Sequence, residues 1–182
     1  MRNYIRKCFF LILLSFCGVS SGLTDLEEIV MKDNVRNFYK VSDGIYRSAQ
    51  PDKASMELLY TAGVKTILNL RKYHSDEYEA KNTRLNLERI KIDAGKIKDE
   101  DIIEALKILG NSEKPILIHC WHGSDRTGVV VAMYRIIYEG ASKEDAIKEL
   151  RDSKYGYHEF IYGNIVKYIN NADIEKLKAK IL

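Results

Sequence analysis

Short apolar runs and longer amphipathic stretches alternate along most of the chain. Residues 64–70 and 115–118 are predominantly apolar, which predicts two short buried strands. Residues 85–92 alternate apolar and charged side chains and predict a third strand. Two short aromatic and β-branched runs within residues 37–48 flank Asp43-Gly44, a dipeptide typical of hairpin turns. The pattern therefore predicts a hairpin followed by three separate strands.

Amphipathic segments lie between and after these strands. The predicted helices cover residues 52–62, ending at Gly63; 99–109, ending at Gly110; 129–138; and, in the C-terminal third, a helix capped by Ser142 and Asp145, then 160–169 and 174–181. Strands and helices in this order predict an α/β fold, with a central, mostly parallel sheet flanked by helices. Ligands of such sheets bind beyond the carboxyl ends of the strands.

The N-terminus has the layout of a secretory signal peptide, which we assign to residues 1–22. Residues 1–7 are positively charged, residues 8–19 are apolar, and small residues follow. We expect cleavage near Ser21 or Gly22 and export to a bacterial periplasm. An uncleaved membrane anchor is the alternative, and a lipoprotein through Cys17 is disfavoured because bulky Phe16 precedes it. Contact with a membrane is expected only if this segment is retained or lipidated.

Length and charge favour one domain after this leader. The chain has 182 residues, 46% of them hydrophobic, which is enough for one good core. We divide the remainder into a linker, 23–36, and a single domain, 37–182. The net charge of +3 equals that of the three basic residues in 1–22, so the rest is neutral. Nothing in it indicates binding to nucleic acid.

The cysteine content limits the possible chemistry. Two of the three cysteines, Cys8 and Cys17, lie in the predicted leader, so the mature chain would keep Cys120 alone. A lone thiol forms no internal disulfide and has no resolving partner. This excludes a disulfide scaffold and disfavours redox enzymes, including arsenate reductases that need further cysteines.

Cys120 follows a predicted strand and is six residues from Arg126, close to the predicted helix 129–138. A loop that curls into a helix start turns backbone N–H groups inward, and the helix dipole adds positive partial charge there. Such a loop binds a tetrahedral dianion and stabilises a thiolate at Cys120. Arg126 can hold two phosphoryl oxygens with its planar guanidinium, and Gly123 permits a positive φ in mid-loop.

Two further residues of the stretch have predicted supporting positions. We expect the hydroxyl of Thr127 to donate a hydrogen bond to the sulfur of Cys120, which would help the thiolate act as a leaving group. We expect His119 to lie behind the loop and hydrogen-bond its backbone.

The stretch HCWHGSDRTG resembles the HCxxGxxR[ST]G signature of cysteine-dependent protein tyrosine phosphatases. It is most similar to the compact dual-specificity group, particularly its exported bacterial members, and VSDGIYRSAQP resembles the opening of that domain. The resemblance implies a dual-specificity phosphatase-like fold, a cysteinyl-phosphate intermediate on Cys120, and no metal or other cofactor. It also implies a phosphate loop, which besides Cys120 contains Trp121, His122, Gly123, Ser124, Asp125, Arg126 and Thr127.

The resemblance also requires a carboxylic acid that protonates the leaving oxygen. In the family this is an aspartate on a loop after the preceding strand, which matches Asp93 at the end of ERIKID. Asp125 is the rival, because CxxGxDR resembles the loop of the phosphoinositide-directed myotubularin group. Asp99 and Asp101 are expected to serve the N-terminus of a helix instead.

The loop composition narrows the substrate class. Selection of polyphosphorylated inositols favours Lys or Arg between the cysteine and the arginine, whereas this loop is neutral to acidic. We therefore expect phosphomonoesters, phosphotyrosine or phosphoserine/threonine proteins first. A phosphoinositide or another small phosphate ester, or an inactive phosphate-binding module, stays open as the alternative. A sulfurtransferase is disfavoured because Arg126-Thr127-Gly128 has no evident purpose there.

Three features around the loop have open assignments. Arg47 lies either near the phosphate mouth or in a surface salt bridge, and Trp121 either stacks on a phenyl phosphate or points into the fold. Residues 71–82, with Tyr73, His74 and Tyr78, are expected to form a rim loop.

Overall fold

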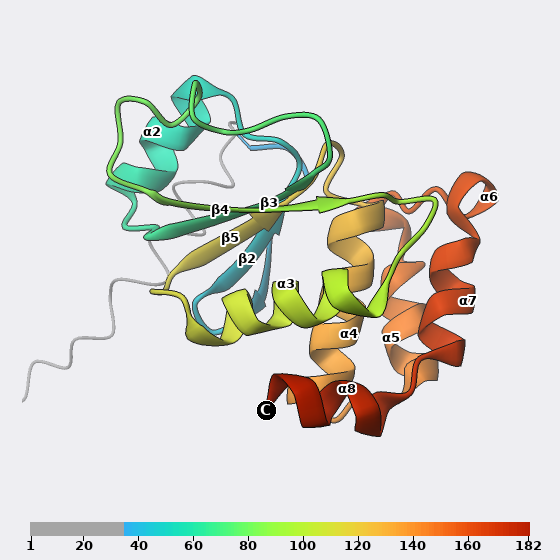
Figure 1. Cartoon of the computed structure of the whole chain (residues 1–182). Coiled ribbons are helices and arrows are strands. Elements are labelled where there is room, and N and C mark those ends of the chain that lie inside the picture. Colours follow the sequence, from blue (N-terminus) through green and yellow to red (C-terminus); the bar gives the residue numbers. More distant parts are fainter. Residues whose placement is uncertain (1–34) are drawn as a thin grey trace, which may run out of the picture.

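The computed structural model describes residues 35–182, so the predicted leader and most of the predicted linker lie outside the described residues. Five strands form one sheet in the order β1-β2-β5-β3-β4. They are β1 (Tyr39–Ser42), β2 (Ile45–Ser48), β3 (Thr66–Arg71), β4 (Asn86–Ile92) and β5 (Ile116–His119). All neighbours are parallel except the β1–β2 hairpin (Figure 1). The predicted mostly parallel sheet is confirmed.

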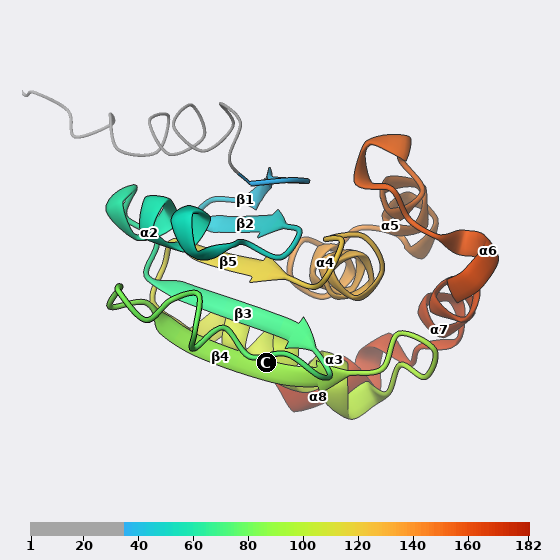
Figure 2. The same ribbon diagram turned by 90° about the horizontal axis from the view of Figure 1, so that it is seen from above.

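Helices cover both faces of this sheet. They are α2 (Lys53–Thr61), α3 (Asp99–Asn111), α4 (Asp125–Tyr138), α5 (Lys143–Leu150), α6 (Glu159–Tyr162), α7 (Asn164–Asn171) and α8 (Ile174–Ile181), with a 3₁₀ turn, η1 (Ser153–Tyr155). Figure 2 shows α2 on one side of the sheet and α3 and α8 on the other. None of the helices in residues 35–182 is long and apolar enough to cross a membrane.

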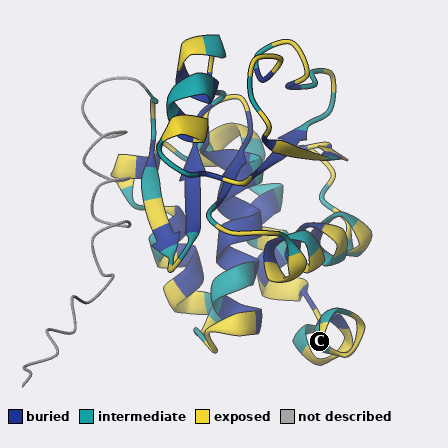
Figure 3. Ribbon diagram, turned by 90° about the vertical axis from the view of Figure 1, so that its left-hand side faces the viewer, coloured by how far each residue is buried: buried dark blue, intermediate teal, exposed yellow. Residues whose placement is uncertain are grey.

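The central strand β5 supplies both cores. Ile116 and Ile118 pack in the large core with α3, α4, α5, α7 and α8, whereas Leu117 packs in a smaller core with Met56 and Leu59 of α2. A strand covered on both faces has no solvent side, which explains its continuous apolar run. In Figure 3 the middle of the sheet is accordingly buried, and exposed residues lie on the outer helices and loops.

Three predicted helix boundaries are wrong. Helix α4 begins at Asp125, four residues before the predicted start of helix 129–138. Gly110 lies inside α3, which continues to Asn111. A Cβ on Gly110 would lie 2.7 Å from the hydroxyl of Tyr138, which donates a hydrogen bond to the carbonyl of Leu106, so this glycine allows close packing instead of ending the helix. The predicted helix 160–169 is two helices, α6 and α7, which meet at Gly163.

The parallel strands bring their carboxyl ends to one edge of the sheet. Ser48 of β2 and Asn69 of β3 both pair with His119 at the end of β5. The segments that follow these strands begin at Ala49, Lys72, Asp93 and Cys120. The fold thus gathers both Cys120 and Asp93 at the edge where such sheets bind ligands.

Candidate active site

The phosphate loop connects β5 to α4 and rests against the end of β2. Cys120 is the first residue after β5 and is 1% exposed. The backbone N–H of Gln50 donates to the carbonyl of Trp121 at 3.1 Å, and the side chain of Asn37 donates to the carbonyl of His122 at 2.9 Å. The loop is therefore held from the hairpin side before the helix begins.

Gly123 is the tightest point of the loop. Its φ is +76°, a region that side chains other than glycine rarely adopt. A Cβ at this position would lie 2.5 Å from the backbone carbon and oxygen of Ser48. Both the backbone conformation and the close approach to β2 therefore require glycine.

Arg126 is the second residue of α4 and is half-buried. The Nε of its guanidinium is buried and has no hydrogen-bond partner among residues 35–182. Arg126 lines a hollow of about 210 Å³ together with Asp93, Lys72, Tyr73 and Tyr162. Cys120 and Arg126 thus occupy the two ends of a loop that leads into a helix N-terminus, an arrangement suited to a tetrahedral anion.

The expected hydrogen bond from Thr127 to the sulfur is not formed. The hydroxyl oxygen of Thr127 is buried and has no hydrogen-bond partner among residues 35–182. Thr127 lies in the first turn of α4 and is one of its buried residues. Its hydroxyl therefore lies near the phosphate loop but donates no hydrogen bond to the described residues.

His119 lies behind the loop, as predicted, and has a partner that the sequence pattern did not indicate. One imidazole nitrogen is 3.2 Å from the carbonyl of Cys120, and the other is 2.8 Å from a carboxylate oxygen of Asp76. Both side chains are buried. Burial alone would raise the pKa of Asp76, but hydrogen bonds from His119 and Gln50 and the charge of His119 together lower it. The pair fixes the first peptide of the phosphate loop.

Arg47 is neither at the phosphate mouth nor in a surface salt bridge. It is 1% exposed and its guanidinium donates a 2.7 Å hydrogen bond to the carbonyl of Gly123. The guanidinium also lies 4.0 Å from the centre of the Tyr155 ring. Burial lowers the pKa of Arg47, while Tyr155 and Cys120 act in the opposite direction. A cation is therefore buried directly under the loop.

The two candidate acids have different surroundings. Asp125 is buried, and one of its oxygens accepts a hydrogen bond from the backbone N–H of His158 at 2.9 Å. Its second oxygen lies 3.0 Å from Nδ1 of the same histidine. Asp125 thus fastens the loop to the segment before α6, and both its oxygens have partners.

Asp93 lies exposed in the hollow that Arg126 also lines. Its carboxylate accepts a 2.8 Å hydrogen bond from Lys72 and one of 3.0 Å from the backbone of Gly95. These bonds, the one from Lys72 foremost, lower the pKa of Asp93. Asp99 and Asp101 are in the first turn of α3, as expected.

Trp121, the residue after Cys120, is 47% exposed, so it does not point into the fold. The guanidinium of Arg71 lies 4.3 Å from its ring centre. A second hollow of about 410 Å³ lies there, lined in part by Trp121, Arg71, His74 and Tyr78. Residues of the predicted rim loop therefore border both hollows, one of which also contains Arg126 and the other Trp121.

The remaining loop residues differ in exposure. Ser124 is buried, and His122 is exposed. Partial burial and the neighbouring His158 lower the pKa of His122, which favours its neutral imidazole. His158 and Asn37, like Arg47 and Asp76, are loop partners that sequence reasoning did not find.

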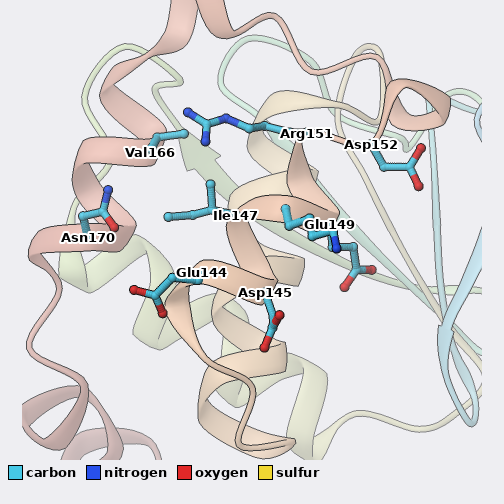
Figure 4. A pocket seen from close by; sticks show the side chains of 9 residues that line it. Glu144, Asp145, Ile147, Glu149, Arg151, Asp152, Val166 and Asn170 are labelled. Atoms are coloured by element: carbon cyan, nitrogen blue, oxygen red, sulfur yellow. The ribbon is translucent and has the colours of Figure 1, made fainter.

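A larger groove lies elsewhere. It has a volume of about 900 Å³ and is bordered by Ile147 and Arg151 near α5 and by Val166 and Asn170 of α7 (Figure 4). None of the phosphate-loop residues lines it.

Comparison with known proteins agrees with this geometry. The model of the tyrosine phosphatase family matches residues 34–151. The dual specificity protein phosphatase TpbA of Pseudomonas aeruginosa is 31% identical over 144 residues, which are 78% of this chain and 65% of TpbA. The chain thus spans less than two thirds of that relative.

A structure of TpbA itself and one further relative bear on the site. The crystal structure of P. aeruginosa TpbA in complex with pTyr superimposes with a TM-score of 0.72 at 30% identity, covering 80% of this chain and 90% of that one. Inositol diphosphatase DSP2 of Oryza sativa subsp. japonica is 37% identical over 111 residues, 54% of this chain and 53% of that protein. With the family model matched across the sheet, the phosphate loop and α4, the chain belongs to the tyrosine phosphatase family.

Proposed function

We propose that the protein is a cysteine-dependent phosphatase of the tyrosine or dual-specificity type that hydrolyses phosphomonoesters. The observation that carries this proposal is the placement of Cys120 at the start of a loop that ends in Arg126 on the first turn of α4. Such a loop favours a bound phosphoryl dianion and a thiolate beside it, because its backbone N–H groups, the helix dipole and the guanidinium all act at the same site.

The reaction has two steps. The Cys120 thiolate attacks phosphorus, an S–P bond forms and the ester P–O bond breaks, while Arg126 and the loop amides stabilise charge on the equatorial oxygens. Asp93 gives a proton to the leaving oxygen. Water then attacks the cysteinyl-phosphate, Asp93 takes up a proton, the S–P bond breaks, and phosphate and the thiolate are released.

We assign the acid role to Asp93 because it lies exposed in the same hollow as Arg126. Both oxygens of Asp125 are partnered by His158, so its protonation would break contacts that hold the loop. Asp125 is accordingly assigned to loop positioning.

The proposed substrate is a phosphorylated protein, phosphotyrosine first. The pTyr-bound relative supports this choice, as do the exposed Trp121 and the hollows at Arg126 and at Trp121, which offer room for residues flanking the phosphate. A small inositol phosphate is the second candidate, favoured by the similarity to a plant inositol diphosphatase and by Arg71 and Lys72 at the rim.

A dephosphorylation panel tests both candidates. Release of phosphate from phosphotyrosine, phosphoserine and phosphothreonine peptides and from inositol phosphates is measured for the parent chain and Cys120→Ser. We expect the parent chain to release phosphate from the peptides. This activity should be abolished in Cys120→Ser, blocked by vanadate and unaffected by EDTA. Turnover by Cys120→Ser, or turnover resistant to vanadate, contradicts the mechanism, and a clear preference for inositol phosphates transfers the assignment to the second candidate.

We also propose export to the periplasm. The positively charged residues 1–7, the apolar residues 8–19 and the small residues 20–22 after them support it. The N-terminal sequence of the protein recovered from a periplasmic fraction should begin near Ser21 or Gly22. Recovery of the full-length chain in the membrane fraction would instead support the anchor.

A further inference from the structure

Three side chains with metal-binding atoms come together beside the phosphate loop. The ligand atoms of His122, Asp125 and His158 all lie within 4.8 Å of one another. The two loop residues are separated from His158 by more than thirty positions, so the sequence showed no clustered ligands. His122 is exposed and the side chain of His158 is 40% exposed, so an ion can reach them from solvent.

Part of this cluster already has the spacing of a coordination site. Nδ1 of His158 lies 3.0 Å from one oxygen of Asp125, and the other oxygen is fixed by the backbone N–H of His158. The rings of His122 and His158 are adjacent, with centres 5.1 Å apart. Two ligand atoms on a tetrahedral zinc ion are about 3.3 Å apart at ordinary Zn–N and Zn–O distances. The three ligand atoms, now within 4.8 Å of one another, would have to draw together to this spacing around an ion.

We propose that His122, Asp125 and His158 form a binding site for Zn²⁺ at the edge of the phosphate loop. Two imidazoles and a carboxylate are a donor set that zinc favours, and three protein ligands leave a fourth position for water or an anion. This ion takes no part in the phosphoryl transfer proposed above. It links the loop to the segment before α6.

A second group, His74, Asp76 and Glu79, has similar spacing and serves as the matched control. Both oxygens of Asp76 are held there by residues outside the group, one by His119 and the other by Gln50. The partners of Asp125, in contrast, both belong to His158, which is itself one of the three proposed ligands. The His119 pair is buried, so its loss would be costly. This group, which has one imidazole and two carboxylates, is therefore the poorer zinc site.

Calorimetric titration with Zn²⁺ tests the site without any measurement of activity. The titrations use Cys120→Ser, which removes the thiolate as a competing ligand, alone and combined with His158→Gln or His74→Gln. One equivalent should bind to Cys120→Ser and to the His74→Gln form, and affinity should fall at least about tenfold with His158→Gln. Undiminished binding with His158→Gln, loss of binding with His74→Gln, or no binding to Cys120→Ser would overturn the proposal.

Circular dichroism checks that each variant is folded, and His122→Gln replaces His158→Gln if the latter is not. The expected result for His122→Gln is the same fall in affinity, and unchanged binding by this variant would equally overturn the site.

A consequence for turnover rests on the proposed function. An ion that links the loop to the segment before α6 should slow hydrolysis of para-nitrophenyl phosphate, reversibly by EDTA, in the chain that keeps Cys120. The concentration of Zn²⁺ that halves the rate should rise about tenfold in His158→Gln. Equal inhibition of the parent chain and His158→Gln would mean that Zn²⁺ inhibits through Cys120, and it would overturn this consequence. A chain without phosphatase activity would refute the proposed function, and the binding titration would then decide the zinc site.

Discussion

Arg47 in β2 donates a 2.7 Å hydrogen bond to the carbonyl of Gly123 at the centre of the phosphate loop. The two residues are 76 positions apart in the chain. The bond directs this carbonyl toward the buried guanidinium. The same cation lies near enough to Cys120 for their charges to interact. A cation buried under the loop can therefore both hold the loop open and stabilise the thiolate.

Replacement of this cation tests that role. Arg47→Met should slow alkylation of Cys120 by iodoacetamide at neutral pH and lower kcat/KM by about tenfold to a hundredfold, because loop amides shift and a nearby positive charge is lost. Lys40→Met, which removes an exposed cation from the neighbouring strand β1, is the control and should change neither quantity. An alkylation rate equal to that of the parent would show that the loop holds its shape and charge without Arg47.

The leaving group distinguishes the two candidate acids. Asp93→Asn should cost about 10²- to 10⁴-fold on an alkyl phosphate, whose leaving oxygen needs a proton, and much less on para-nitrophenyl phosphate. Asp125→Asn should slow both substrates by similar factors, since Asp125 acts through the position of the loop. Rates for each variant on each substrate give the comparison. If the dependence on leaving group appears in Asp125→Asn alone, the acid is Asp125.

Lys72 should set the pH range of the enzyme through Asp93. The hydrogen bond from Lys72 is the largest cause that lowers the pKa of Asp93. A general acid must be protonated, so the rate falls as pH rises through that pKa. Lys72→Gln should raise the pKa and move this fall in kcat to higher pH. Lys91→Gln, an exposed change on β4, is the control, and a profile for Lys72→Gln that coincides with the parent would exclude the coupling.

The order of strands and helices could be predicted because each is encoded locally. The run around Ile116 to Ile118 is apolar throughout, and the hairpin turn carries Asp43-Gly44 with φ +72° at the glycine. The loop from Cys120 to Arg126 was likewise contained in one stretch. The helix end predicted at Gly110 is wrong because a glycine in a helix either terminates it or allows close packing. Here the close approach of Tyr138 explains the glycine.

The partners of the loop could not be predicted from the sequence. Arg47, Asp76 and His158 reach the loop from 76, 43 and 33 positions away from the residues they contact. Their local sequence predicts a strand for Arg47, a rim loop for Asp76 and a turn for His158. Polar and charged side chains in such segments are ordinarily exposed to solvent. Only the meeting of strand ends at one edge of the sheet brings these side chains to the loop, and it buries Arg47 and Asp76 there.

The buried pair of Asp76 and His119 should stabilise the fold above mildly acidic pH. The pKa of Asp76 is lower in the folded chain than its unfolded value of about 3.9. Its contribution is therefore full above that value and is lost as pH falls through the folded pKa. Asp76→Asn should lower the free energy of unfolding by about 1.5–3 kcal/mol at neutral pH. Each kcal/mol corresponds to about 2–4 °C in Tm for a domain of this size.

Thermal unfolding of Asp76→Asn between pH 7 and pH 3 should show a gap from the parent that narrows below about pH 4. Glu77→Gln, an exposed neighbour, serves as the control. A gap of constant size over this range would mean that the carboxylate charge contributes nothing and that Asp76 acts through packing alone.

Replacement of Gly123 and of Gly140 by alanine allows the cost of backbone strain to be measured apart from that of a steric clash. Their φ angles are +76° and +71°, so Gly→Ala costs each about 1–2 kcal/mol in backbone strain. A Cβ at Gly140 meets nothing within 4 Å, whereas one at Gly123 would lie 2.5 Å from the backbone of Ser48. Gly123→Ala must therefore push the loop off β2, where Arg47 and Gln50 hold it. We expect vanadate binding and turnover to fall at least about a hundredfold in Gly123→Ala. Gly140→Ala should lose stability but keep both, and a Gly123→Ala protein that binds vanadate like Gly140→Ala would mean that contact with β2 does not shape the anion site.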